Sequence, residues 1–179
     1  VDGKYFGRLS AIIQKRFQLK PLNFTKTKDI LPYVDEMFRV FDNAYSKLST
    51  YVPISETQIA YFKKKYISFI NPEYIKFVVD QNNEIVAFAI VMPSFSEALQ
   101  KIKGRLFPFG FLKILRAKKT SKDVDFYLIG INPEYQNKGV TAIIFHEYYK
   151  TFLPLGIENC IRTPELADNL AVQKLWKDF

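Results

Sequence analysis

One stretch constrains the fold more than any other: an apolar strand runs directly into a polar loop and then into an apolar-periodic helix. The strand, residues 126–131, stops at Asn132-Pro133, and the helical pattern covers residues 140–152. The first backbone amides of a helix lack partners within it and carry a partial positive charge. The stretch therefore predicts an anion site, above all for phosphate, where this helix begins.

Two residues of the loop suit such a site. Gly139 lacks a Cβ, so its backbone can approach a ligand closely or adopt a positive φ. Lys138 adds a cation beside the same amides. The P-loop and dinucleotide-binding patterns are both absent, so neither nucleotide fold is supported.

Composition excludes several classes of protein. The 179 residues suit one domain with a sizeable core, and a hydrophobic content of 48% excludes a disordered chain. No apolar run approaches the ~20 residues of a membrane span, and no signal peptide opens the sequence. The single Cys160 fits a reducing, cytoplasmic location. One Cys and one His, without ligand-spaced carboxylates, predict no metal site.

Periodicity predicts the other elements in a mixed α/β order. Pro21 favours an edge position for the first strand, and Ser55 with Gln58 fits a capping box. The strand at 85–92 is apolar on both faces, so we expect it at the centre of a sheet. Residues 1–16 are predicted to be an N-terminal lead-in that precedes the domain. The predicted elements are strand 17–24, helices 30–48 and 55–70, a hairpin of strands 74–80 and 85–92, strand 123–131, helix 140–152, strand 157–163 and helix 169–179.

Residues 94–122 form a basic, Phe-rich insertion between the third and fourth strands. Eight cations against one acid, Glu97, give it a net charge of +7, nearly all of the +8 of the chain. Three interpretations are open: a helical hairpin whose apolar side packs on the domain, a substrate lid that attracts an anionic ligand or its phosphates, and a surface for membranes or nucleic acid. No nucleic-acid motif accompanies it, so we do not expect nucleic acid as the partner. The cations are Lys101, Lys103, Arg105, Lys113, Arg116, Lys118, Lys119 and Lys122.

The loop resembles the acetyl-CoA pyrophosphate loop of the GNAT N-acetyltransferase superfamily, [Q/R]-x-x-G-x-[G/A]. Gln136 and Gly139 match its first two defined positions, and Thr141 replaces the small residue of the third. The order of elements over residues 17–179 is also similar to the GNAT order. Asn169 matches an Asn that the family carries after its fifth strand, and Trp176 stands where the family has a Tyr.

Several separated segments are similar, more narrowly, to the C-terminal acetyltransferase-like domain of long bacterial proteins. The family normally adds one or two strands after the helix that holds Trp176, so we expect either an incomplete domain or an edge supplied by another segment. The similar segments are those around Tyr51-Val-Pro-Ile-Ser-Glu, Met92-Pro-Ser-Phe, Gly104-Arg-Leu-Phe-Pro-Phe-Gly, Gly130-Ile-Asn-Pro-Glu-Tyr and Glu165-Leu-Ala-Asp-Asn169.

The resemblance implies a GNAT acyltransferase fold, with a central mixed sheet flanked by helices and two strands that separate at a bulge. It also implies acetyl-CoA or another acyl-CoA as co-substrate, without a metal. The backbone around Ile131 would bond the thioester carbonyl, and Asn169 would contact the pantetheine arm. The diphosphate would be held by the backbone amides of Gln136, Asn137, Lys138, Gly139, Val140 and Thr141.

The implied activity is N-acylation of a primary amine or amino-terminal group by direct attack on the thioester. Trp176 has only an indole N–H and cannot replace the acid that the family's Tyr provides. The candidate bases are Asp125 and Glu165, with Tyr127 as a relay on the same strand face as Asp125. The alternative is a GNAT-like module without turnover, which binds within a larger protein and places its basic face on an anionic partner.

Overall fold

The computed structural model describes residues 3–67, 69–103, 105, 107, 109–164, 169 and 172–173, called the described residues below. They form a five-stranded sheet in the order β1-β2-β3-β4-β5. The first four strands pair antiparallel, and β5 pairs parallel with β4. The strands are β1 (Lys20–Leu22), β2 (Ile75–Val79), β3 (Ile85–Pro93), β4 (Asp123–Ile131) and β5 (Asn159–Arg162).

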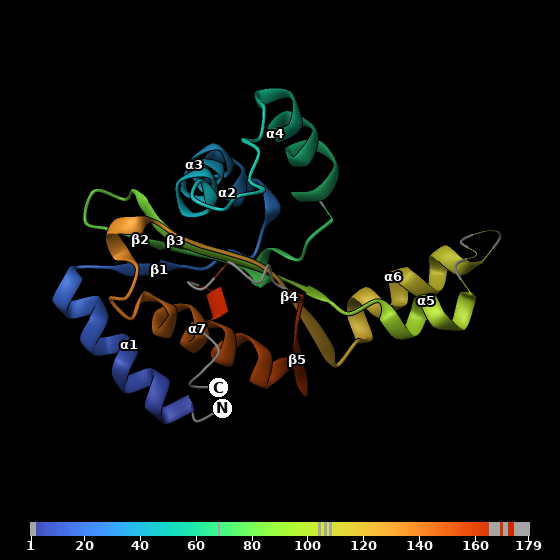
Figure 1. Cartoon of the computed structure of the whole chain (residues 1–179). Helices are drawn as coiled ribbons and strands as arrows, with labels where there is room; N and C mark the ends of the chain where they lie inside the picture. Colours follow the sequence, from blue (N-terminus) through green and yellow to red (C-terminus); the bar gives the residue numbers. More distant parts are fainter. Residues whose placement is uncertain are drawn as a thin grey trace.

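Helices cover both faces of this sheet (Figure 1). One face carries α1 (Gly3–Phe17) and α7 (Val140–Leu155), and the other carries α2 (Thr27–Ile30), α3 (Val34–Tyr45) and α4 (Glu56–Phe62). The structure is therefore a mixed α/β fold with a central sheet between two helical layers, as the sequence predicts.

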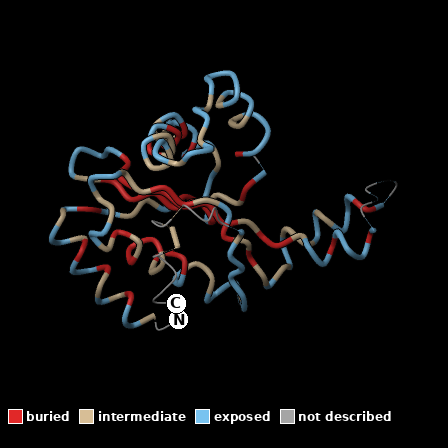
Figure 2. Tube along the Cα trace, viewed as in Figure 1, coloured by how far each residue is buried: buried red, intermediate tan, exposed pale blue. Residues whose placement is uncertain are grey.

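The core lies where both helical layers meet β2 and β3, and it appears as the buried centre of Figure 2. Phe77 and Phe88 are its largest fully buried side chains. Ile30 and Met37 pack from one layer, and Ile143 packs from the other. The central position of β3 and the edge position of β1 are both confirmed.

Two predicted elements differ in extent from the structure. The helix expected over 55–70 begins with the predicted capping box of Ser55 and Gln58, but α4 ends at Phe62 and a π-helical turn follows over Lys63–Ile67. The first strand is shorter than 17–24 because Phe17 belongs to α1. The predicted helix over 169–179 lies largely outside the described residues.

The helix α1 is an element that the sequence analysis did not assign. It packs along α7 through two glycines one turn apart. A Cβ at Gly3 would collide with the ring of Tyr149, and a Cβ at Gly7 would lie 3.1 Å from the ring of His146. The absence of side chains at Gly3 and Gly7 therefore lets the two helices approach closely.

Strand β4 changes partners along its length, and this change opens the sheet. Its pairing with β5 ends at Phe126, opposite Arg162, whereas its pairing with β3 continues to Ile131. A bulge falls at Tyr127, which has no partner on β3 between those of Phe126 and Leu128. Beyond this bulge β4 and β5 separate, so the second half of β4 has an open edge.

The basic insertion folds as a helical hairpin of α5 (Ser96–Ile102) and α6 (Gly110–Thr120). It leaves the sheet after β3, returns at the start of β4, and extends away from the two helical layers (Figure 1). Residues 96–120 are called the basic hairpin below.

Candidate functional site

The open edge of β4 presents backbone groups to the gap beside it. In an antiparallel ladder, residues alternate between those that bond the partner strand and those that face away. Asn132 donates its N–H to β3 at 2.8 Å. The carbonyl of Ile129 instead accepts from the Tyr45 hydroxyl at 2.7 Å, and that of Ile131 accepts from the Gln136 side chain at 3.1 Å. The alternation therefore directs the N–H groups of Ile129 and Ile131 into the gap.

The loop after β4 turns its backbone in a way that suits an anion. Asn137 and Gly139 both have left-handed backbone, with φ of 59° and 77°. Turns of this kind bring successive N–H groups together in a concavity. Helix α7 begins at Val140, directly after Gly139, so its unpartnered first amides adjoin that concavity. The positive φ expected of Gly139 is confirmed.

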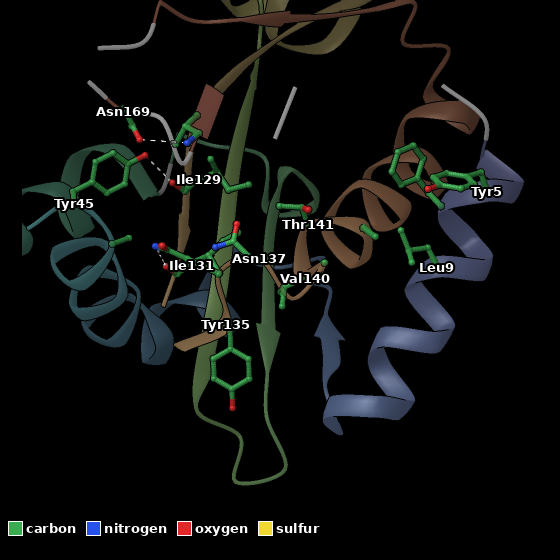
Figure 3. Close-up of a pocket in the computed structure, with 16 residues that line it drawn as sticks. Tyr5, Leu9, Tyr45, Ile129, Ile131, Tyr135, Asn137, Val140, Thr141 and Asn169 are labelled. Carbon is green, nitrogen blue, oxygen red and sulfur yellow. Dashed lines mark hydrogen bonds between the residues drawn. The ribbon is translucent and has the colours of Figure 1, made fainter. Parts of the chain in front are cut away.

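The open edge and the loop line one cavity of about 370 Å³ (Figure 3). Tyr5, Phe6 and Leu9 of α1 line it as well, and Tyr45 of α3 points toward the backbone of Ile129. Of the residues predicted to bind a cofactor, the lining includes Ile131, Gln136, Asn137, Gly139, Val140, Thr141 and Asn169.

Lys138 is the exception among the predicted loop residues. It does not line this cavity, and its ammonium lies 5.4 Å from the ring centre of Phe17 and 5.2 Å from that of Tyr135. Contact with the ring of Phe17 joins the loop to the end of α1. The expected role of Lys138 as a cation beside the helix amides stays a prediction.

The cavity suits an elongated anionic molecule with amide groups. Backbone N–H groups of the loop and of α7 could hold a diphosphate, and the free N–H groups of β4 could bond amide or thioester carbonyls. Apolar side chains from α1 provide the remaining wall. This set of donors fits an acyl-CoA, whose diphosphate and pantetheine arm need both kinds of contact.

A second pocket of about 420 Å³ lies across β4 from the first. The two share Tyr45, Ile129 and Asn169, so they meet at the open edge. Tyr51 lines the second pocket and donates its hydroxyl hydrogen bond to the carboxylate of Asp42. Burial and this bond raise the pKa of Tyr51, which keeps its phenol protonated.

The predicted catalytic residues are not brought together. Tyr127, at the bulge, lines the second pocket and is 53% exposed. Asp125 lies on the part of β4 that pairs with both neighbours, and it lines neither pocket. The bulge interrupts the pairing with β3 just beyond Asp125, and a joint role of Asp125 and Tyr127 stays a prediction. Glu165 and Trp176 lie outside the described residues.

Sequence reasoning missed the residues that line the cavity from outside the loop. Tyr45 was assigned to the apolar face of its helix, where it does lie, but its hydroxyl reaches Ile129. A Tyr within an otherwise aliphatic and Phe-rich stripe is the signal that could have marked it, because a buried phenol needs a partner. The α1 residues had a signal too: Phe6, Leu9 and Ile13 recur at helical spacing.

A buried polar network fixes α7 behind the loop. Lys76 of β2 is 2% exposed and donates to Asn23 at 2.6 Å and to Thr151 at 2.8 Å. Burial lowers the pKa of Lys76 to about 8, although the nearby carboxylate of Glu147 acts in the opposite direction. The pKa of Glu147 is lowered: burial alone would raise it, but hydrogen bonds from Lys150 and Asn23 prevail. The network joins β2 to the C-terminal half of α7.

Neither a metal-binding cluster nor a membrane-spanning helix is present among the described residues. They contain no group of three or more His, Cys, Asp or Glu side chains that could hold a metal ion. They also contain no helix that is both long enough and apolar enough to cross a membrane.

Comparison with known sequences finds one distant relative. No known family profile matches the chain. Protein YghO of Escherichia coli (strain K12) is 22% identical over 134 residues, which are 74% of this chain and 33% of YghO. The chain thus spans about a third of the length of that relative.

Solved structures with a similar fold are acetyltransferases. An aminoglycoside acetyltransferase from an uncultured soil metagenomic sample superposes with a TM-score of 0.53 at 15% identity, over 90% of this chain and 87% of that chain. An N-acetyltransferase from Staphylococcus aureus Mu50 gives 0.54 at 12% identity, over 89% and 81%. The Drosophila melanogaster polyamine N-acetyltransferase gives 0.50 at 11% identity, over 88% and 81%. With the separation of β4 from β5 and the loop before α7, these likenesses identify the fold: this chain has the fold of the GNAT N-acetyltransferases.

Proposed function

We propose that this chain is an acyl-CoA-dependent N-acyltransferase that acylates a primary amine by direct attack. One observation carries the proposal: where β4 leaves β5, the strand residues whose amides face away from β3 and the first residues of α7 line the same cavity. A strand edge and a helix start that merely packed together would leave these donors buried without partners, which costs stability. A ligand with a diphosphate and carbonyl groups satisfies them.

The bound acyl-CoA supplies an activated thioester carbonyl, to which the amine nitrogen adds while the CoA thiol departs. The amides of Asn137, Gly139, Val140 and Thr141 hold the diphosphate, and Asn169 contacts the pantetheine arm. The amides of Gln136 and Lys138 instead donate to the carbonyls of Pro133 and Tyr135 within the loop. The amide of Ile131 bonds the thioester carbonyl and stabilises the negative charge that develops on its oxygen. The same proposal locates the chain in the cytoplasm, which fits its single cysteine.

In this proposal the amine enters from the second pocket, because that pocket meets the first at the open edge of β4. Its described lining is mostly aliphatic and aromatic, and it contains no Asp or Glu. Arg162 is the one charged side chain among those described lining residues. Among these described residues, an acceptor with several ammonium groups would find no carboxylate. We therefore propose an amine on an apolar body as the acceptor, with an anionic group that adds to the contacts of Arg162.

The amine must lose a proton as the new bond forms. We assign this proton to the pair of Tyr51 and Asp42: Tyr51 passes its own hydrogen to the carboxylate and takes the proton from the amine. The raised pKa of Tyr51 suits this role, because a phenol that stays protonated always has a hydrogen to pass on. Tyr127 remains the proposed relay at the bulge, while Asp125 and Glu165 keep the place of alternative bases.

Release of free thiol from acetyl-CoA tests this proposal. We expect turnover with 2-phenylethylamine and faster turnover with phenylalanine, whose carboxylate can reach Arg162. Spermidine should react at least about tenfold more slowly, because its charges enter an apolar pocket. The Arg162→Gln variant is the matched control and should remove the advantage of phenylalanine alone.

Two outcomes would contradict the proposal in different ways. A preference for spermidine would overturn the acceptor class and leave acyl transfer in place. Saturable binding of acetyl-CoA without thiol release for any amine would overturn transfer itself and favour a module that binds without turnover.

A further inference from the structure

The basic hairpin exposes several large apolar side chains. Phe107 and Phe109, between its two helices, are 82% and 70% exposed. On α6, Phe111, Leu112 and Leu115 are exposed as well, and their spacing puts them on one side of the helix. The ring centres of Phe107 and Phe111 are 6.3 Å apart, so the tip and this stripe form one apolar surface.

Cations surround this apolar surface. Residues 96–120 carry seven Lys or Arg side chains and one acid, Glu97, which is bound to Lys101. On α6, Arg116 borders the stripe and Lys119 lies in line with it, and both are exposed. Neighbouring like charges cost free energy in the free protein, and an anionic surface would relieve that cost.

The structure removes two of the three interpretations of this segment. The apolar side of the basic hairpin does not pack on the domain, because Ala98, Ile102 and Gly110 are its only buried residues among those described. It is not a lid on the candidate site either, because none of its described residues lines either pocket at the open edge of β4. What remains is a surface that acts on something outside the domain.

The base of the hairpin is anchored, which gives the tip a fixed direction. The Lys118 ammonium lies 4.7 Å from the ring centre of Phe69, and the rings of Phe69 and Phe95 are 5.8 Å apart. Ser94, just before the hairpin, donates its N–H to Asp123 of β4 at 2.8 Å. The tip therefore extends from the sheet as a projecting arm (Figures 1 and 2).

We propose that the basic hairpin attaches the protein peripherally to an anionic lipid bilayer, with Phe107 and Phe109 in the headgroup boundary. Exposed aromatic and aliphatic side chains partition into that boundary, and flanking cations bind anionic headgroups. Single-stranded nucleic acid would use rings for stacking, but it offers nothing to the exposed Leu99, Leu112 and Leu115. The aliphatic side chains therefore favour lipid. This inference depends on the hairpin alone and not on the proposed acyl transfer.

Co-sedimentation with vesicles tests the attachment. The whole chain should bind vesicles of phosphatidylcholine with about one third phosphatidylglycerol, bind pure phosphatidylcholine at least about tenfold more weakly, and dissociate at high salt. Phe107→Ser with Phe109→Ser should weaken binding at least about tenfold. Its matched control, Ile12→Ser with Leu153→Ser, removes two exposed apolar side chains elsewhere and should change nothing.

Charge variants separate the two contributions to binding. Arg116→Gln with Lys119→Gln should weaken binding to anionic vesicles about tenfold and reduce its salt dependence. Lys26→Gln with Lys28→Gln, which removes two exposed cations near β1, should leave binding unchanged. In a Phe107→Trp variant, indole emission should shift to shorter wavelength on anionic vesicles.

Three results would overturn the attachment. The first is no binding to anionic vesicles at low salt. The second is equal loss of binding in the hairpin variants and in their controls. The third is tighter binding to a single-stranded oligonucleotide than to anionic vesicles, which would assign the surface to nucleic acid instead.

Discussion

The cleft at the open edge of β4 and the basic hairpin are joined by the same strand, yet they use apolar residues in opposite ways. At the cleft, the apolar residues of β3 and β4 are covered by helices on both faces of the sheet. In the hairpin, the apolar residues are exposed and only the base contacts the domain. An apolar stripe in a sequence therefore predicts a face that is stabilised by leaving water. It does not predict which partner covers that face.

The largest expected contrast is in stability. Gly130, near the cleft end of β4, lies beneath the ring of the fully buried Phe88, and a Cβ there would collide with that ring. Gly130→Val should lower the free energy of unfolding by at least about 3 kcal/mol, because the packed core cannot accommodate the side chain. Phe107→Ser, at the hairpin tip, should change it by less than about 0.5 kcal/mol. Urea unfolding measures both values, and similar losses would remove the contrast between the two regions.

The contribution of the buried Lys76 to stability should depend on pH, which distinguishes the core from the basic hairpin. Lys76→Met removes the hydrogen bonds to Asn23 and Thr151 and should destabilise the fold by about 3 kcal/mol at neutral pH. The folded pKa of Lys76, about 8, lies below its ordinary value of 10.5. Between these values the unfolded chain binds more protons, so the stability of the wild type rises with pH across this window.

The variant lacks this titration. The difference in the free energy of unfolding between wild type and Lys76→Met should therefore widen as pH rises from about 8 to about 10.5. Unfolding at several pH values measures the gap. The exposed Lys113→Gln in the hairpin is the control and should show a small gap that does not depend on pH in this window. A gap for Lys76→Met that narrows with rising pH would contradict the assigned environment of this side chain.

A smaller effect concerns the loop itself. Gly139 and Gly156 both have positive φ, at 77° and 65°, but only Gly139 has a neighbour in the direction of a Cβ, the Cδ1 of Ile13 at 3.1 Å. Gly156→Ala should cost about 1 kcal/mol for its backbone conformation alone. Gly139→Ala should cost about 2 kcal/mol, because Ile13 of α1 must also move. Equal costs would show that α1 does not support the loop.

The sequence predicted those parts of the fold that depend on local periodicity. The hairpin of β2 and β3, the helix α7 and the turn at Gly139 follow from apolar spacing and from the need for a positive φ. The bulge at Tyr127 could not be predicted, because it depends on how β4 registers against β3. The place of Asp125 on the fully paired part of β4 depends on the same register.

The candidate site was predicted where one segment of chain forms it, and missed where distant segments meet. The loop residues are adjacent in sequence, so their common location follows from the chain itself. Tyr45 and Tyr5 reach the cavity from α3 and α1, which are far away in sequence. The contacts of Lys138 with Phe17 and Tyr135 could not be predicted, because Phe17 approaches the loop only after folding.

Binding of acetyl-CoA, measured by isothermal titration, tests the central claim most directly: the first amides of α7 hold a diphosphate. Thr141 is the best position for the variant, because it lines the cavity in the first turn of α7 and does not have the strained backbone of Gly139. A carboxylate there favours the helix but repels a phosphate. Wild type and Thr141→Gln should give saturable heats with similar affinity, whereas Thr141→Glu should weaken binding at least about 100-fold. No saturable heat from the wild type, or equal affinities for Thr141→Glu and Thr141→Gln, would contradict the account.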